Sequence, residues 1–253
     1  MTIRREEEFI GVREAGRVVR RCLVEMTDHV RPGVTTAELD DVAGRVFRRL
    51  RARSAPRLVY GFPGEVCISV NEEIVHGIPS DRALEEGDLV KLDVTVEKQG
   101  YMADAAITLG VGRLPAERQA LIDCSRRAFF RAMRVARAGQ RVNALGREIE
   151  SETKAGGFTV VRDLTGHGIG RTIHEPPAIP NYDDPRARQP LVEGMVLAVE
   201  PILCMGSGES ETAKDGWTVL TSDRTLAAHY EQTIVITAEA PIIVTEVRGA
   251  TGG

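Results

Sequence analysis

The sequence predicts an α+β protein made of two similar halves, each with two helices followed by strands. Apolar residues recur at helical spacing over 6–28, 36–50, 116–138 and 142–155. Segments of strand length, several with alternating polar and apolar residues, follow each pair of helices. Short motifs also return in the same order in the second half, which indicates an internal duplication.

Composition indicates a soluble, cytoplasmic protein. With 42% hydrophobic and 28% charged residues, the 253-residue chain can bury a sizeable core, and its net charge of −4 gives no reason to expect nucleic acid or an anionic membrane as a required partner. The N-terminus has no signal-peptide core, and no run approaches the ~18 apolar residues of a membrane span. The four cysteines lack C-x-x-C spacing, which favours reduced thiols over a disulfide framework or a thiolate metal site.

The first half begins with two amphipathic helices. The first, over 6–28, ends before Arg31-Pro32-Gly33, and the second begins at a capping box formed by Thr35 and Glu38. The other elements expected before residue 80 are a Pro- and Gly-rich loop over 53–64 with Tyr60 and Phe62 exposed, a strand over 66–70 and a polar turn holding His76.

Two strands over 89–97 and 101–109 form a hairpin around which the rest of the chain is organised. In the first strand, alternation places four apolar residues on one face and Asp93 on the other. With a two-residue turn, Asp93 lies opposite or diagonal to Asp104, and either register puts both carboxylates on one face. Buried carboxylates this close require a cation, whereas a solvent-facing sheet with two harmless aspartates is an equal alternative from the hairpin alone.

The second half repeats the order of helices and strands. Its expected elements are helices over 116–138 and 142–155, a strand over 158–162, a glycine-rich segment over 164–177, a loop over 180–190, a strand over 191–203 stopped by Pro201, a loop over 206–216 and two strands over about 217–221 and 229–237. The tail that ends in Gly252-Gly253 is expected to be frayed.

Two spaced motifs carry the evidence for duplication. Arg-x-Gly-x5-Leu occurs at 31–39 and 137–145, and Glu-Gly-x5 followed by an acid occurs at 86–93 and 193–200. Pseudo-repeats over about 6–112 and 113–247 are therefore expected. Packed about a pseudo-twofold axis, the two repeats bring Asp93 and Glu200 together at the centre.

Histidines and a further carboxylate offer metal ligands in the second half. His167 and His174 lie in the glycine-rich segment, which is only weakly like a phosphate loop because Pro176-Pro177 blocks a long helix; its glycines more plausibly allow close backbone approach. Glu231 lies in the last strand. Taken alone, Glu231 is more simply a solvated residue of an edge strand, and a single histidine is more often an ordinary core or surface residue.

Taken together, four carboxylates and one imidazole suit a pair of divalent ions. The candidate ligands are Asp93, Asp104, His167, Glu200 and Glu231. This set is too negative for a single Zn²⁺ ion and fits two ions about 3.5–4 Å apart, bridged by carboxylates. Oxygen-rich ligation with one histidine favours manganese, iron, cobalt or zinc.

These residues and their spacing resemble the type I methionine aminopeptidases over nearly the whole chain. The shared motifs are NEEIVHGIP (71–79), LDVTV (92–96), GHGIGRTIHEPP (166–177), VEGMVLAVEP (192–201), DGWTVLT (215–221) and HYEQT (229–233). The resemblance implies a pita-bread fold, with duplicated halves and a central, mainly antiparallel sheet covered by helices, in a single catalytic domain over 1–253. Type II enzymes carry a large insertion between the last two glutamates, whereas 30 residues separate Glu200 from Glu231 here, which favours type I.

The resemblance also implies roles for individual residues. The five candidates become the ligands of two metal ions, with Asp104 and Glu231 bridging, and the metals lower the pKa of a bound water. Glu200 is then the general base, His174 stabilises the developing oxyanion, and His76 contacts the peptide nitrogen on the leaving side. The free α-amine of the substrate ligates one metal.

The implied substrate is the N-terminal methionine of nascent proteins and peptides, removed when the second residue is small. Family matching places Phe62, Cys67 and Trp217 around the methionine side chain, although Trp217 as a plain core residue is nearly as good an interpretation. A monomer that needs no nucleic acid and no membrane is expected, and a transient contact with the ribosome is compatible with this role.

Two other functions remain open at this point. Aminopeptidase P and prolidase use the same five ligands, but they usually carry a separate N-terminal domain and lack the NEEIVHGIP context. The second is a non-catalytic pita-bread module that binds protein or RNA. Known modules of that kind have lost metal ligands, whereas all five are kept here.

Overall fold

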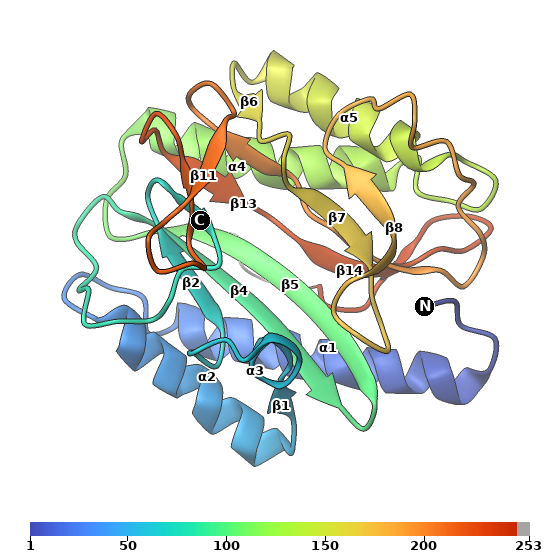
Figure 1. Cartoon of the computed structure of the whole chain (residues 1–253), viewed down its shortest axis with the longest axis horizontal. Coiled ribbons are helices and arrows are strands. Elements are labelled where there is room, and N and C mark those ends of the chain that lie inside the picture. Colours follow the sequence, from blue (N-terminus) through green and yellow to red (C-terminus); the bar gives the residue numbers. More distant parts are fainter. Residues whose placement is uncertain (247–253) are drawn as a thin grey trace.

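Two pairs of helices lie on opposite sides of a layer of strands in the computed structural model, which describes residues 1–246 (Figure 1). The first pair is α1 (Glu6–Thr27) and α2 (Thr36–Leu50), and the second is α4 (Ala116–Met133) and α5 (Val142–Ala155). This arrangement confirms the α+β fold class expected from the sequence. The tail at Gly252-Gly253, expected to be frayed, lies outside the described residues.

Local sequence rules explain where α2 begins, whereas α4 ends earlier than its apolar pattern suggests. The hydroxyl of Thr35 accepts from the N–H of Glu38, and the Glu38 carboxylate accepts from the N–H of Thr35, so the expected capping box is present. α4 ends at Met133, five residues earlier than expected. Beyond it, the N–H of Ala138 donates to the carbonyl of Thr237 instead of continuing the helix. Within residues 1–246, no helix has the length and apolar character needed to cross a bilayer.

The first sheet is centred on β4 (Leu89–Lys98). β5 (Tyr101–Gly110) pairs with β4 as a hairpin, and β1 (Arg53–Ser54) and β2 (Cys67–Val70) also pair with β4. The turn is Gln99-Gly100, and both residues have the positive φ that a two-residue hairpin turn favours. Apolar residues on one face of β4 pack with α1 and α2 in a buried core, which leaves the opposite face for the second half of the chain.

The segment expected to be a loop over 53–64 is partly structured. It contains β1 and α3 (Ala55–Tyr60). Tyr60 is exposed as expected, but the prediction for Phe62 is wrong, because Phe62 is only 3% exposed. Its ring packs edge-on against Trp217 with the ring centroids 5.3 Å apart. The covering residue comes from a distant part of the chain, so local composition gave no sign of this burial.

The second large sheet contains five antiparallel strands in the order β15-β14-β9-β7-β8. Its members are β7 (Thr165–Gly168), β8 (Glu175–Pro180), β9 (Val196–Val199), β14 (Gln232–Val235) and β15 (Ile242–Ile243). Residues of β9 and β14 pack with α4 and α5 in a second buried core. Each half therefore covers its own sheet with its own pair of helices.

Two three-stranded sheets complete the strands, in the orders β13-β10-β6 and β11-β12-β3. Their members are β3 (Glu73–Val75), β6 (Thr159–Val160), β10 (Ile202–Cys204), β11 (Ser210–Thr212), β12 (Val219–Thr221) and β13 (Ala227–His229). The strand expected over 191–203 is therefore two strands in different sheets, β9 and β10. The chain changes sheet at Glu200-Pro201, because proline has no N–H with which to continue a ladder. The loop expected over 206–216 contains β11, and the two final strands are three, β12 to β14.

Candidate metal centre

The seven residues expected to act as ligands or catalytic groups line one cavity of about 90 Å³. They are the five candidate ligands Asp93, Asp104, His167, Glu200 and Glu231, together with His76 and His174. Three of the seven come from the first half of the chain, up to residue 104, and the other four come from the second half, from residue 167 onward. The cavity therefore lies where segments of both halves meet.

The hairpin holds its two carboxylates on one face, as expected. Asp93 pairs with Ala106 and Thr95 pairs with Asp104, so the two aspartates lie diagonally across the ladder. Thr233, from the second half, clamps the backbone of Asp104: its hydroxyl accepts from the N–H at 2.9 Å and donates to the carbonyl at 2.8 Å. The register leaves both carboxylates facing the second half of the chain.

Three segments of the second half bring the remaining candidates to β5. His167 lies on β7, and Glu200 follows β9 directly. Glu231 lies in the break between β13 and β14, so the expectation of one continuous last strand is wrong. At this break, Glu231 and Ala106 of β5 exchange backbone hydrogen bonds of 2.8 and 3.2 Å. Backbone pairing between the halves therefore holds Glu231 opposite the hairpin.

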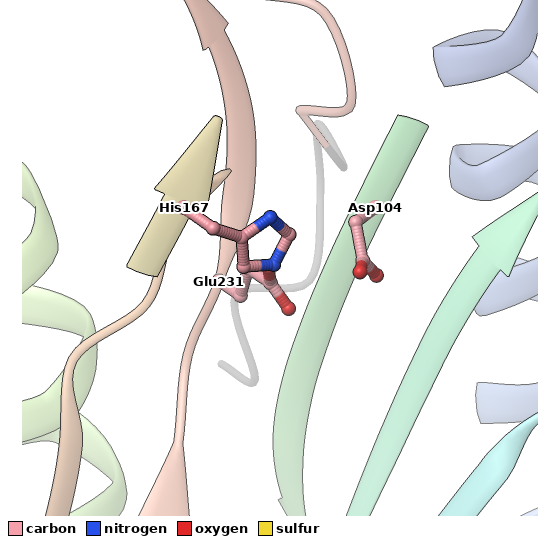
Figure 2. A group of neighbouring side chains, drawn as sticks. All are labelled: Asp104, His167 and Glu231. Atoms are coloured by element: carbon pink, nitrogen blue, oxygen red, sulfur yellow. The ribbon is translucent and has the colours of Figure 1, made fainter. Parts of the chain in front are cut away.

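Asp104, His167 and Glu231 point toward one another (Figure 2). Their ligand atoms lie within 4.8 Å of one another, and Glu200, His229 and Glu231 form a second group within the same limit. Glu231 belongs to both groups, and Nε2 of His167 lies 3.6 Å from Oε1 of Glu200. This arrangement suits two neighbouring cations that share a carboxylate.

Several buried polar atoms of this cluster have no hydrogen-bond partner within residues 1–246. They are Oδ1 of Asp104, Oε1 of Glu231 and both ring nitrogens of His229. An unpaired polar group inside a protein costs about 1–3 kcal/mol, and native structures keep few of them. Carboxylate oxygens and imidazole nitrogens are ligands of divalent transition metals, so these residues fit such ions.

Burial shifts the proton affinity of the cluster. Burial, and then the charges of neighbouring carboxylates, raise the pKa of Asp93, Glu200 and Glu231 well above the usual range. Burial also lowers the pKa of His167 to about 4, so its ring is neutral at pH 7 and able to bind a metal. The carboxylates therefore hold protons more strongly than exposed ones do, and a cation has to displace those protons.

His76 and His174 line the same cavity and lie outside both groups of candidate ligands. His76 has a φ of 59°, a left-handed backbone conformation that non-glycine residues adopt mainly where the surrounding structure imposes it. The hydroxyl of Tyr60 lies 2.6 Å from Nδ1 of His174, and the His167 ring packs edge-on against His174 with centroids 4.3 Å apart. Burial lowers the pKa of His174, and it lowers the pKa of His76 to about 4.

The three residues expected around a methionine side chain do not line this cavity. Cys67 is buried on β2, directly opposite Asp93 in the β2–β4 ladder. Phe62 and Trp217 contact each other. β12, which follows Trp217, pairs with β3, which leads into His76. The three residues therefore lie on segments that adjoin the cavity.

His229 lines the cavity and was not expected from the sequence. Its Nε2 lies 3.5 Å from Oε2 of Glu200 and 3.6 Å from Oε2 of Glu231. The sequence contained a usable signal. Residues two apart in an extended segment face the same side, so His229 is expected to face the same cavity as Glu231. Tyr230, between them, packs instead against Phe129.

An α+β fold with an acidic, histidine-containing cavity where its two halves meet is the arrangement of a metal-binding protein. Comparison with known proteins then gives the family. Residues 11–238 match the model of metallopeptidase family M24, and the chain belongs to this family. Metal dependence follows from this membership and is consistent with the ligand groups of the cavity.

The relatives include proteins of nearly the same length. The chain is 41% identical to the methionine aminopeptidase of Clostridium perfringens, over 97% of this chain and 99% of that protein. It is similar to the crystal structure of methionine aminopeptidase from Thermotoga maritima, with a TM-score of 0.94 and 35% identity, covering 97% of this chain and 100% of the other. The prolidase of Pyrococcus furiosus shares the fold, with a TM-score of 0.78, but is 21% identical, and this chain covers 65% of it. The pita-bread fold and the resemblance seen in the sequence are confirmed.

Proposed function

We propose that this chain is a metal-dependent aminopeptidase that removes the N-terminal methionine of nascent proteins and peptides when the second residue is small. The observation that carries the proposal is the convergence of four carboxylates and His167 on one cavity. It is supported by similarity over nearly the full length to a methionine aminopeptidase. A prolidase shares only the fold, at 21% identity, which disfavours the proline-directed alternative.

In this proposal two divalent ions, drawn from cobalt, manganese, iron and zinc, are held by Asp93, Asp104, His167, Glu200 and Glu231. Asp104 and Glu231 would be the ligands shared by the two ions, and for Glu231 this is supported by its membership of both ligand groups. When bound, the ions supply a polarised carbonyl and a water of lowered pKa. The unpartnered oxygens of Asp104 and Glu231 are satisfied in that state.

The protein's own groups move protons and position the substrate. Glu200 is the general base that accepts a proton from the attacking water. The Tyr60 hydroxyl lies 2.6 Å from Nδ1 of His174. With the hydroxyl as donor, the neutral ring would carry its proton on Nε2 and offer that N–H to the oxyanion. His76, at the left-handed position beside the cavity, contacts the leaving peptide nitrogen.

Specificity and cellular setting complete the proposal. Phe62, Cys67 and Trp217 enclose the methionine side chain, supported by their positions on segments that adjoin the cavity. The chain acts as a monomeric, cytoplasmic enzyme with transient access to the ribosome. Residues 1–253 form one catalytic domain, with pseudo-repeats over about 6–112 and 113–247.

The experiment that tests the function compares two kinds of peptide. Purified chain, stripped with a chelator and reloaded with Mn²⁺ or Co²⁺, is expected to release methionine from Met-Ala-Ser and to leave X-Pro peptides intact. The chelated protein is the matched control and is expected to be inactive. Cleavage of X-Pro peptides alone would show a proline-directed enzyme. Cleavage of neither peptide, together with binding of ribosomes, would favour a non-catalytic module.

A further inference from the structure

His229 is a fully buried imidazole whose ring has no hydrogen-bond partner within residues 1–246. Its side chain is 1% exposed, and neither Nδ1 nor Nε2 forms a hydrogen bond with the described residues. A buried imidazole normally pairs at least one ring nitrogen, because an unsatisfied buried polar group is costly. The ring nitrogens therefore need a binding partner that is not one of the neighbouring side chains, such as a bound ion.

The backbone of His229 is held firmly from both sides. Its N–H donates to Oγ1 of Thr108 at 2.8 Å, and its carbonyl accepts from the same hydroxyl at 2.8 Å. On the other side it pairs with Ile202 at the start of β10. Two strands thus position the backbone of the residue, while the ring itself forms no hydrogen bond with any part of the described chain.

The distances around the ring match those between ligands of one ion. Nε2 lies 3.5 Å from Oε2 of Glu200 and 3.6 Å from Oε2 of Glu231. Two atoms that each bind an ion at about 2.0–2.2 Å are roughly 2.8–3.6 Å apart, for angles between octahedral and tetrahedral. Ordinary N–H···O hydrogen bonds are shorter, at about 2.7–3.2 Å. The spacing therefore suits a shared cation better than a direct hydrogen bond.

We propose that His229 is a further metal ligand, which binds through Nε2 the ion that it shares with Glu200 and Glu231. The inference rests on the proposed metal centre and extends its five ligands to six. The two ligand groups then have the same composition, one histidine each with a shared Glu231: His167 with Asp104 in one, and His229 with Glu200 in the other. A second imidazole shifts the preference of the centre toward zinc, cobalt and iron and away from magnesium.

Nuclear magnetic resonance of the histidine rings tests this directly, because the chain has only five histidines. Protein labelled with ¹⁵N-histidine is stripped of metal and titrated with Zn²⁺. The ring nitrogens of two histidines are expected to move to the metal-bound range, and His229→Gln and His167→Gln each remove one of these two signals. His29, exposed and hydrogen-bonded to the Glu25 carbonyl, serves as the internal reference whose signal does not move.

Isothermal titration of Zn²⁺ into the same proteins gives a second measurement. His229→Gln is expected to weaken one binding event by about 10-fold or more, while His29→Gln, the matched control, leaves both events unchanged. A wild-type spectrum with a single zinc-bound imidazole, assigned to His167, overturns the inference without requiring any variant to fold. If the wild-type chain binds no Zn²⁺ at all, the proposed metal centre fails as well, so the two failures are distinguishable.

Discussion

Lys91 and the acidic cavity are two buried charged regions on the same strand, and they differ in how their groups are satisfied. Lys91 is 1% exposed, and its Nζ donates to the carbonyls of Asn71 at 2.7 Å and Ala227 at 3.2 Å. Two residues along β4, Asp93 enters the cavity, where oxygens of Asp104 and Glu231 find no partner within residues 1–246. No ion pair joins Lys91 to these carboxylates in that part of the chain.

The difference separates structural charge from functional charge. The Lys91 amino group has carbonyl partners within the protein, so its hydrogen bonds need no added ion. Buried carboxylates that have no cationic side chain beside them are stable only if protons or bound metal ions neutralise their charge. The first arrangement predicts effects on stability, and the second predicts effects on metal binding and activity.

The largest effect on metal binding and activity is expected from removing Glu231, the carboxylate common to both ligand groups. Glu231→Ala is expected to lower activity by roughly three orders of magnitude or more, since metal stabilisation of several kcal/mol is lost. The fold is expected to persist, because the change deletes an unsatisfied buried acid. Peptide turnover, metal analysis and circular dichroism on the purified variant measure these effects. The exposed Glu209 offers a control, as Glu209→Ala is expected to change none of them. Full activity in Glu231→Ala would contradict a centre in which two metal ions share this carboxylate.

His76 tests where the metal-binding region ends. His76→Ala is expected to lower turnover by about 100-fold, as for the loss of a positioned donor or proton-transfer group, with metal content unchanged. Because His76 has a positive φ, His76→Asn is the companion variant, since asparagine tolerates that backbone conformation better than alanine. A similar loss in both variants assigns the effect to the ring. Loss of metal from either variant would move His76 into the ligand set.

The elements set by local rules were predictable from the sequence. The capping box at Thr35 depends on neighbouring residues and is as expected. The hairpin has one of the two registers that the sequence left open, and both of those put Asp93 and Asp104 on one face. The diagonal placement of Asp93 and Asp104 follows from that register. The recurrence of an acid at residue 200 correctly predicted that Glu200 would line the same cavity as Asp93.

Features set by distant contacts were not predictable in the same way. Phe62 is buried against Trp217. Pro201 was expected to stop a strand, but the pairing of the next segment, β10, with β6 and β13 was not expected. His229 differs from these, because its offset of two from Glu231 was a usable signal. His229 was not predicted because only the carboxylate of Glu231, and not the neighbouring imidazole, was considered as a ligand.

Replacing Lys91 tests the structural side of the comparison. Burial lowers the pKa of Lys91 to about 7, against about 10.4 in an unfolded chain. Between these values the unfolded chain binds a proton that the folded chain does not, so the free energy of unfolding rises with pH, by up to about 1.4 kcal/mol per unit. Lys91→Met is expected to abolish this rise. It also removes the Nζ donor to the Ala227 carbonyl, at a cost of about 1–3 kcal/mol, whereas the Asn71 carbonyl still accepts from the N–H of Ala227 at 3.2 Å.

Urea unfolding of metal-free wild type and Lys91→Met at pH 7, 8 and 9 measures the effect as a difference between the two proteins. Metal affinity is expected to be the same in both, since Lys91 lies outside both ligand groups. Parallel pH profiles would mean that Lys91 keeps its proton throughout, held by the carbonyls of Asn71 and Ala227. A loss of metal affinity would mean that the two buried regions are not separate.

The smallest of the expected effects is the release of protons on metal binding, which also distinguishes the cavity carboxylates from Lys91. Because burial raises the pKa of Asp93, Glu200 and Glu231, these carboxyls hold protons at a higher pH than exposed ones, and a cation expels them. Affinity for Mn²⁺ is therefore expected to rise with pH and to level off once the carboxyls are ionised. His167, with a pKa of about 4, is already neutral and contributes no proton between pH 6 and 8.

Calorimetric titrations in buffers of different ionisation enthalpy count the protons released. Release is expected at pH 6 and 7 and is expected to decline toward pH 9. Lys91→Met is expected to give the same count as the wild type, because Lys91 lies outside both ligand groups. Zero release at pH 6 would mean that the carboxyls are ionised before any cation arrives. The cavity would then satisfy its own charge as Lys91 does, and the contrast between the two regions would no longer hold.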